Sequence, residues 1–171
     1  MSVAPFPKTV EPLKMSEQRI DLQGKIALSK LHRLRDLLLD DAGEVSVVLQ
    51  FGKDEQGIRT IVGSLQAEVI MQCQRCLQPV TEKIEAEIKL GVVFNEDGVK
   101  NLPSYYDPLL LSSAEVSLWQ MVEEELILNL PIAAKHSLGE CSIELSYGDE
   151  AALDAPATPN PFQVLAQLKD K

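Results

Sequence analysis

The stretch LQAEVIMQCQRCLQPVTEKIEAEIKL, residues 65–90, decides the fold of this chain. Apolar and polar residues alternate up to Cys73, and the alternation resumes after Pro79. A period of two places one side of a β-strand against a core and the other side in water. Pro79 cannot donate a hydrogen bond to a neighbouring strand, which favours a turn at that point. The stretch therefore predicts two antiparallel strands joined at CQRCLQP, residues 73–79.

Upstream residues predict more strands of the same sheet. Residues 45–51 alternate in the same way, and after a polar loop at residues 52–57 the pattern returns from Ile58 onward, which is typical of a β-hairpin. Residues 20–28 predict a further strand with a bulge or break at Gly24, and Gly63 is expected to bend or interrupt the long run that ends at Cys73.

Two helices are expected beside this sheet. The leucines at 31, 34, 37 and 38 share one helical face, and Ser29 can cap that helix. A second helix is expected from Ser112 or Ser113 up to Pro131, with Glu115 in its first turn and residues 123–125 mostly facing water. Residues 1–17 are expected to wrap over the surface, and residues 95–111 to form a polar connection. The predicted fold class is α+β, an antiparallel sheet of hairpins with a few packed helices.

The 171 residues divide unevenly by composition. We expect a compact α+β domain over residues 1–146, because these carry the alternating and helical patterns. Residues 147–160 are rich in Pro, Ala and acidic residues and predict a flexible linker. Residues 161–171 predict a short helix with Phe162 on an apolar face, which would dock either on its own domain or on a partner.

Charge restricts the partners. The formal net charge is −10, and residues 61–171 carry all of the acidic excess, with seven Lys or Arg against seventeen Asp or Glu. Nucleic-acid binding draws on contacts between cationic groups and phosphates, so tight autonomous RNA binding is disfavoured. One local exception is a basic cluster, which would contact a phosphate or an acidic partner, or would simply be a solvated helix face. Its members are Lys25, Lys30, His32, Arg33 and Arg35.

No long uncharged apolar run and no signal-peptide pattern occur in the sequence. Three cysteines in a chain of this length do not form a disulfide framework of the secreted kind. We therefore expect a cytoplasmic protein with no membrane partner.

The pair Cys73 and Cys76 is open to three interpretations: a metal site, disulfide exchange, or packing of reduced thiols. A structural zinc site needs four ligands, usually from two short-range pairs, and His136 with Cys141 would be the second pair. Thioredoxin-like motifs stand at the start of a helix, whereas a strand follows here, so a redox role is weaker, although Arg75 would favour a thiolate. Other catalytic motifs are scarce, with no phosphate-binding glycine loop and only two histidines.

Three segments resemble the bacterial YceD family, the large ribosomal RNA subunit accumulation proteins. They are CQRCLQPV at residues 73–80, MVEEELILNLPI at 121–132 and PNPFQVLAQLK at 159–169, together with RIDLQG at 19–24. The resemblance implies a role in the synthesis, processing or stability of 23S ribosomal RNA, without an established catalytic activity. By this resemblance, the family's signature cysteines correspond to Cys73 and Cys76, with Arg75 between them. The family's terminal motif corresponds to residues 160–162. Some relatives have further cysteines after the long helix, where this chain has only His136 and Cys141, so a four-cysteine site does not transfer.

Two functions of different classes follow. In the first, the protein is a non-enzymatic factor that engages a ribosomal protein, a pre-ribosomal particle or an RNA-processing enzyme. Its contact residues are expected to be Lys30, Arg33, Arg35, Arg75 and Phe162. In the second, it is a metal- or thiol-dependent enzyme acting on RNA or a small molecule, which would need an open coordination position beside the cysteines.

Overall fold

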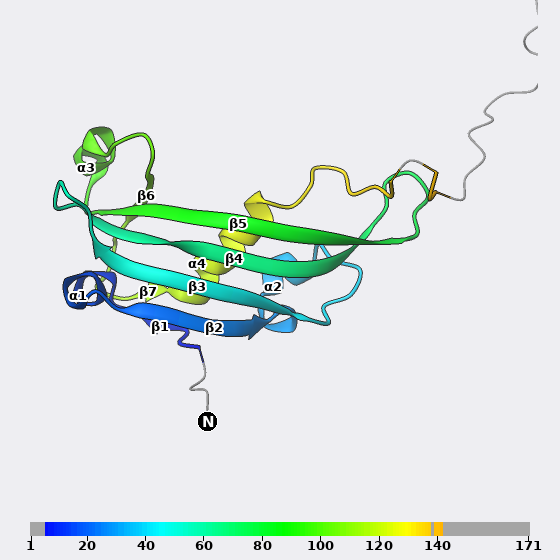
Figure 1. Cartoon of the computed structure of the whole chain (residues 1–171), viewed down its shortest axis with the longest axis horizontal. Helices are drawn as coiled ribbons and strands as arrows, with labels where there is room; N and C mark the ends of the chain where they lie inside the picture. Colours follow the sequence, from blue (N-terminus) through cyan, green and yellow to red (C-terminus); the bar gives the residue numbers. More distant parts are fainter. Residues whose placement is uncertain (1–5, 138, 142–171) are drawn as a thin grey trace, which may run out of the picture. The chain divides into compact units, whose positions relative to one another are not determined.

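A five-stranded sheet forms the centre of the computed structural model, which describes residues 6–137 and 139–141 of the chain (Figure 1). These residues belong to one unit, Met1–Cys141. The strands lie in the order β2-β3-β4-β5-β6, and their bounds are Asp21–Ala27, Glu44–Lys53, Arg59–Gln72, Pro79–Val93 and Asp107–Leu110. The first four strands are antiparallel to their neighbours, whereas β6 runs parallel to β5. The predicted α+β class and both hairpins are confirmed.

The two glycines expected to interrupt strands do not do so. β4 pairs with β3 and β5 without a break at Gly63, and β2 pairs continuously through Gly24. A Cβ atom on Gly63 would lie 2.0 Å from the carbonyl oxygen of Val48, and one on Gly24 would lie 2.5 Å from the Phe6 ring. Glycine is therefore needed at Gly63, where the close neighbour is backbone, and at Gly24 it leaves room for the Phe6 ring; both strands stay intact.

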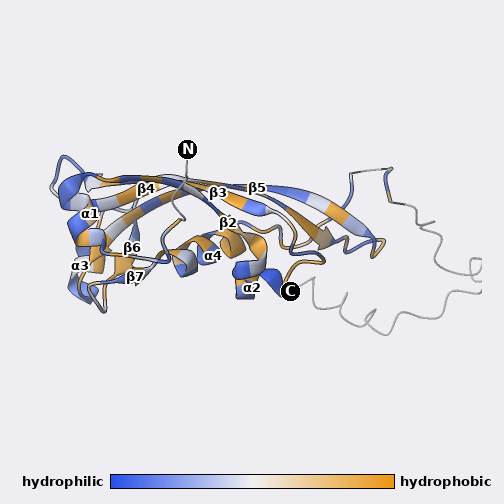
Figure 2. Ribbon diagram, turned by 90° about the horizontal axis from the view of Figure 1, so that it is seen from below, coloured by the Kyte–Doolittle hydropathy of each residue, from blue (hydrophilic) through white to orange (hydrophobic). Residues whose placement is uncertain are grey.

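Helices and short elements surround the sheet. The helices are α1 (Pro12–Gln18), a 3-10 turn η1 (Leu28–Lys30), α2 (His32–Arg35), α3 (Glu96–Asn101) and α4 (Leu118–Leu128). β1 (Thr9–Val10) and β7 (Val116–Ser117) form a separate two-stranded sheet. Seen edge-on, α4 and α2 lie on one side of the large sheet (Figure 2).

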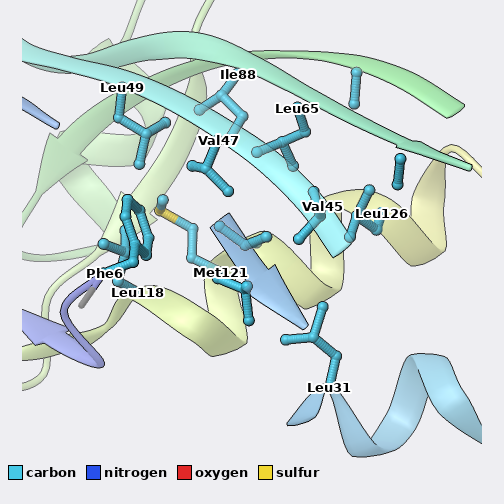
Figure 3. Close-up of a cluster of buried hydrophobic side chains, with 14 of the residues drawn as sticks. Phe6, Leu31, Val45, Val47, Leu49, Leu65, Ile88, Leu118, Met121 and Leu126 are labelled. Atoms are coloured by element: carbon cyan, nitrogen blue, oxygen red, sulfur yellow. The ribbon is translucent and has the colours of Figure 1, made fainter. Parts of the chain in front are cut away.

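The core lies between the sheet and α4 (Figure 3). Leu65 from β4 and Ile88 from β5 point to the same side as Val45, Val47 and Leu49 from β3. The helix contributes apolar side chains at the spacing of one helical face, which are Leu118, Met121, Val122 and Leu126. Alternation in the strands and periodicity in the helix thus bury matching surfaces against each other.

Both predicted helices differ from their expected bounds. α4 begins at Leu118, because Val116 and Ser117 pair with β1, and the Ser117 hydroxyl caps the helix by accepting a hydrogen bond from Gln120 N at 3.2 Å. Ser112, Ser113 and Glu115 therefore lie before the helix. The expected helix at residues 29–38 is reduced to η1 and the four residues of α2.

Glu123 was expected to face water and is instead buried, with 8% of its surface exposed. Its Oε1 accepts hydrogen bonds from the backbone N–H groups of Arg33 at 2.7 Å and Leu34 at 3.2 Å. Both groups lie in the first turn of α2, where the helix leaves N–H groups without internal partners. α4 therefore supplies the cap of α2, and Ser29 does not.

Two segments expected to be irregular contain regular structure. Residues 1–17 include β1 and most of α1, and the connection at 95–111 contains α3 and β6. The domain boundary at residue 146, the predicted linker 147–160 and the terminal helix 161–171 with Phe162 lie outside the described residues. Among the described residues, no helix is long and apolar enough to cross a membrane.

Candidate metal centre at the β4–β5 hairpin tip

The turn between β4 and β5 holds the two sequence-adjacent thiols. Cys73 N donates to the carbonyl of Gln78 at 2.9 Å, and Leu77 N donates to the carbonyl of Cys73 at 2.9 Å. Leu77 has a φ of +60°, a left-handed conformation that closes the turn. Cys73 is fully buried and Cys76 is 8% exposed. The turn therefore directs both thiols inward, whereas the Leu77 side chain is exposed.

The chain after α4 brings the second pair to this turn. Gln74 N donates to the carbonyl oxygen of Ala134 at 2.9 Å, and Ala134 is itself buried against Cys73, Cys76 and Val80. This backbone contact fixes the segment two residues before His136 and places His136 beside the thiols. Cys141 also packs against the cluster.

Four ligand atoms converge at the tip. The Sγ atoms of Cys73 and Cys141 are 3.7 Å apart, and His136 Nδ1 lies 3.3 Å from Cys76 Sγ and 3.7 Å from Cys141 Sγ. All four ligand atoms lie within 4.8 Å of one another. Ligands at about 2.3 Å from a tetrahedral zinc ion are about 3.8 Å from each other. The three separations of 3.3–3.7 Å are close to that value, so the Cys3His cluster could hold a metal ion.

The imidazole of His136 is oriented for such a role. Its Nε2 lies 2.9 Å from the carbonyl oxygen of Pro79. A carbonyl can only accept, so Nε2 carries the proton and donates it, which leaves the Nδ1 lone pair pointing toward the thiols. Metal-binding histidines usually donate their second ring N–H to a carbonyl or carboxylate in this way.

Electrostatics distinguish the thiols. Burial opposes ionisation of Cys73, but hydrogen bonds from the backbone N–H groups of Cys76, His136 and Arg75, and from the Cys76 thiol, lower its pKa to about 5. Burial raises the pKa of Cys141, and its hydrogen bonds and repulsion with Cys73 and Cys76 raise it further. Arg75 Nη1 lies 3.7 Å from Cys141 Sγ. A bound cation would remove the repulsion that disfavours a second thiolate.

The basic residues expected to contact RNA or a partner have neighbours within the protein. Arg33 Nη1 is 3.0 Å from Glu124 Oε1, and the side chain of Arg35 is 3.6 Å from Asp36 Oδ1. Lys30 Nζ lies 5.5 Å from the centre of the Trp119 ring, within cation–π distance. Their role in RNA or partner contact stays a prediction, as does that of Arg75.

Three groups that position other parts of the protein gave no signal in the sequence. The carbonyl of Pro79 orients His136 and the carbonyl of Ala134 anchors the second ligand pair, but backbone atoms act here independently of residue type. Glu123 resembles Glu124 and Glu125 in the sequence, and only its position under α2 distinguishes it.

Comparisons with known proteins agree with the motifs. The profile of the family described as "Large ribosomal RNA subunit accumulation protein YceD" matches residues 61–169. A protein of that name from Haemophilus influenzae is 34% identical over 174 aligned positions, which cover 100% of both chains. No solved structure matches significantly. Since the matched region includes the cysteine turn, α4 and the terminal motif, the chain belongs to the YceD family of large ribosomal RNA subunit accumulation proteins.

Proposed function

We propose that this protein is a non-enzymatic cytoplasmic factor that supports accumulation of the RNA of the large ribosomal subunit, including the synthesis, processing or stability of 23S ribosomal RNA. The observation that carries the proposal is the match to a relative of that name over the full length of both chains. The protein would act by binding a ribosomal protein or an RNA-processing enzyme on the pre-ribosomal particle.

Charge favours a protein partner over bare RNA. The chain carries a net charge of −10, whereas ribosomal proteins are strongly basic, so electrostatic attraction would speed their encounter. The basic cluster expected to contact phosphates is partly neutralised, since Arg33 and Arg35 each lie beside a carboxylate. Direct RNA binding would therefore be weak and secondary.

We further propose that the Cys3His cluster binds a structural zinc ion. The four ligand atoms lie within 4.8 Å of one another, as a tetrahedral site requires, and His136 has the hydrogen bond that orients a metal-binding imidazole. Three thiolates and one imidazole complete a four-coordinate site, which leaves no position for substrate or catalytic water. This arrangement disfavours the metalloenzyme alternative and supports a site that holds the tip in shape.

A complementation experiment tests the function. In a strain lacking its own YceD protein, expression of this chain is expected to restore the level of 23S ribosomal RNA, measured against 16S. An unrestored level at normal expression would contradict the proposal.

The metal is tested separately on purified protein. We expect about one zinc ion per chain by mass spectrometry of the native protein, and loss of that zinc in Cys73→Ser. The Gln72→Ser variant, which changes an exposed neighbour, is the matched control and should keep its zinc. A wild-type protein purified in zinc-containing buffer without bound metal would contradict the site.

A further inference from the structure

β5 has a long unpaired edge. It pairs with β4 from Pro79 to Gly91, but its other neighbour, β6, reaches only Leu90–Val93. Within the described part of the chain, residues 81–89 of β5 have no strand on the side away from β4. Figure 1 shows β5 extending well beyond the end of β6 toward the hairpin tip.

The direction of the backbone groups can be followed along this strand. Val93 accepts a hydrogen bond from Leu111 N, and the carbonyl of Pro79 contacts His136, so both carbonyls point away from β4. Each residue in a strand directs its N–H and C=O to one side, and the sides alternate. The register with β4 is continuous, so odd-numbered residues face the open edge. These are Thr81, Lys83, Glu85, Glu87 and Lys89.

An open edge of this length is unusual in a folded protein. Nine residues of strand present about 30 Å of backbone, at about 3.3 Å per residue. Free edges invite pairing with other chains, and proteins limit this with charged side chains. Lys83, Glu85 and Glu87 are exposed along this edge. Such charged side chains make non-specific pairing less favourable and leave the backbone of the edge accessible to a strand of complementary charge.

The surroundings of the edge are acidic. Lys89 is paired with Glu87 at 2.6 Å, and Lys83 stands opposite Glu68 in the register with β4, so both lysines are offset. Further carboxylates lie nearby, because Glu82 belongs to the same strand and Asp107 begins β6 opposite Leu90. Glu125 is close enough to Asp107 for the charge of Asp107 to raise its pKa, after the larger effect of burial.

Apolar side chains are exposed on the chain that leads from α4 to the tip. Leu128 ends α4 and is 77% exposed, and Ile132 is fully exposed. α4 packs against β5, and two residues beyond Ile132 the chain is bonded to the hairpin turn through Ala134. The segment between α4 and Ala134 therefore exposes apolar side chains beside the open edge of β5. That edge has free backbone hydrogen-bonding groups and negatively charged surroundings.

We propose that the open edge of β5, residues 81–89, binds an extended, basic segment of a large-subunit ribosomal protein as an added sixth strand. The inference rests on the proposed function, which supplies a basic protein partner. Backbone hydrogen bonds to the odd-numbered residues provide the affinity, and the surrounding carboxylates select Lys and Arg in the incoming strand. RNA has no backbone N–H groups that could continue the sheet.

A peptide experiment on the wild-type protein tests the pairing without any variant. The probe is a nine-residue peptide of alternating Lys and Val, and its control has the same sequence with every backbone nitrogen methylated. Both have the same charge, but the methylated peptide has no backbone N–H to donate along either of its edges. We expect binding of the first, with slowed amide exchange at residues 81–89, and affinity at least about tenfold lower for the second. Equal affinities, or no binding of the first peptide, would overturn the proposal.

A pair of variants tests the same edge from the protein side. Glu85→Pro removes a backbone N–H that faces the open edge and makes no bond to β4, and proline is tolerated on edge strands. Glu85→Ala removes the same carboxylate and keeps the N–H. We expect peptide affinity to fall about tenfold further in Glu85→Pro than in Glu85→Ala, with zinc content equal in both. Equal affinity in the two folded variants would contradict the role of the backbone.

Complementation then separates this inference from the proposed function. Wild type and Glu85→Ala are expected to restore 23S ribosomal RNA, and Glu85→Pro is expected to fail at equal protein level. Failure of the wild type would reject the proposed function itself. Restoration by Glu85→Pro as well as by the wild type would leave that function standing and reject the strand-addition site.

Discussion

The hairpin tip and the centre of the sheet belong to the same two strands but are stabilised differently. In the centre, 23 of the described residues, all apolar and buried, come from the sheet, the helices and the N-terminal segment and pack into one cluster. At the tip, the buried cluster contains only four of the residues that the structure describes: Cys73, Cys76, Val80 and Ala134. So few side chains bury little apolar area, and the free energy gained scales with that area. From this comparison, we expect a cross-link such as a bound metal ion to contribute more to the stability of the tip than to that of the centre, where packing dominates.

Metal removal should give the largest difference in amide exchange between the hairpin tip and the centre of the sheet. After chelation, we expect amide exchange at Cys73, Gln74 and Leu77 to accelerate by orders of magnitude, because their hydrogen bonds hold only while the turn is closed. Exchange at Leu49 and Leu65 in the centre should change little. The measurement is hydrogen exchange followed by mass spectrometry or NMR. Equal loss of protection in both regions would show that they fold as a single unit.

A cavity in the centre should have the opposite effect: it should lower the stability of the protein and leave metal binding at the tip unchanged. Leu65 is fully buried, and Leu65→Ala is expected to lower the free energy of unfolding by about 2–5 kcal/mol. The folded variant should still bind metal as the wild type does. Urea denaturation gives the stability and metal analysis gives the occupancy. The control is Gln66→Ala on the exposed face of the same strand, for which a change of about 0.5 kcal/mol or less is expected.

Glu123 connects α4 to α2 within the central region. Glu123→Ala leaves the backbone N–H groups of Arg33 and Leu34 without their acceptor, so we expect a loss of about 1–3 kcal/mol. The matched control is Glu124→Ala, the next residue on the same helix, whose carboxylate is exposed. If the two variants lose equal stability in urea, the buried cap does not contribute as the structure indicates.

The smallest effect is expected at the exposed ion pair of Arg33 and Glu124. Arg33→Gln removes this pair and should change the stability by about 0–1 kcal/mol, because water screens both side chains. The Arg33→Gln variant should alter neither the metal content of the protein nor the rate of amide exchange at the hairpin tip. A drop comparable to that of Glu123→Ala would mean that the Arg33 side chain, and not only its backbone N–H, holds α2.

The cysteine pair shows which parts of the candidate site can be predicted from sequence. The spacing of Cys73 and Cys76 is short, so a turn places both thiols together whatever the rest of the chain does. His136 and Cys141 were also expected at this site, but their approach depends on the path after α4, including the bond between Gln74 N and Ala134. That path is a long-range contact, and the pattern of residues 129–141 contains no local signal for it.

Local periodicity in the sequence was sufficient to determine the hairpins, the apolar faces of β3, β4 and β5, and the approximate position of α4, because each depends on neighbours a few residues away. Tertiary structure decided the rest. The parallel pairing of β6, the burial of Glu123 beneath α2 and the open edge of β5 all depend on elements distant in the chain. Alternation reports which face of a strand is buried, but it carries no information about which strand lies beside it or where that pairing ends.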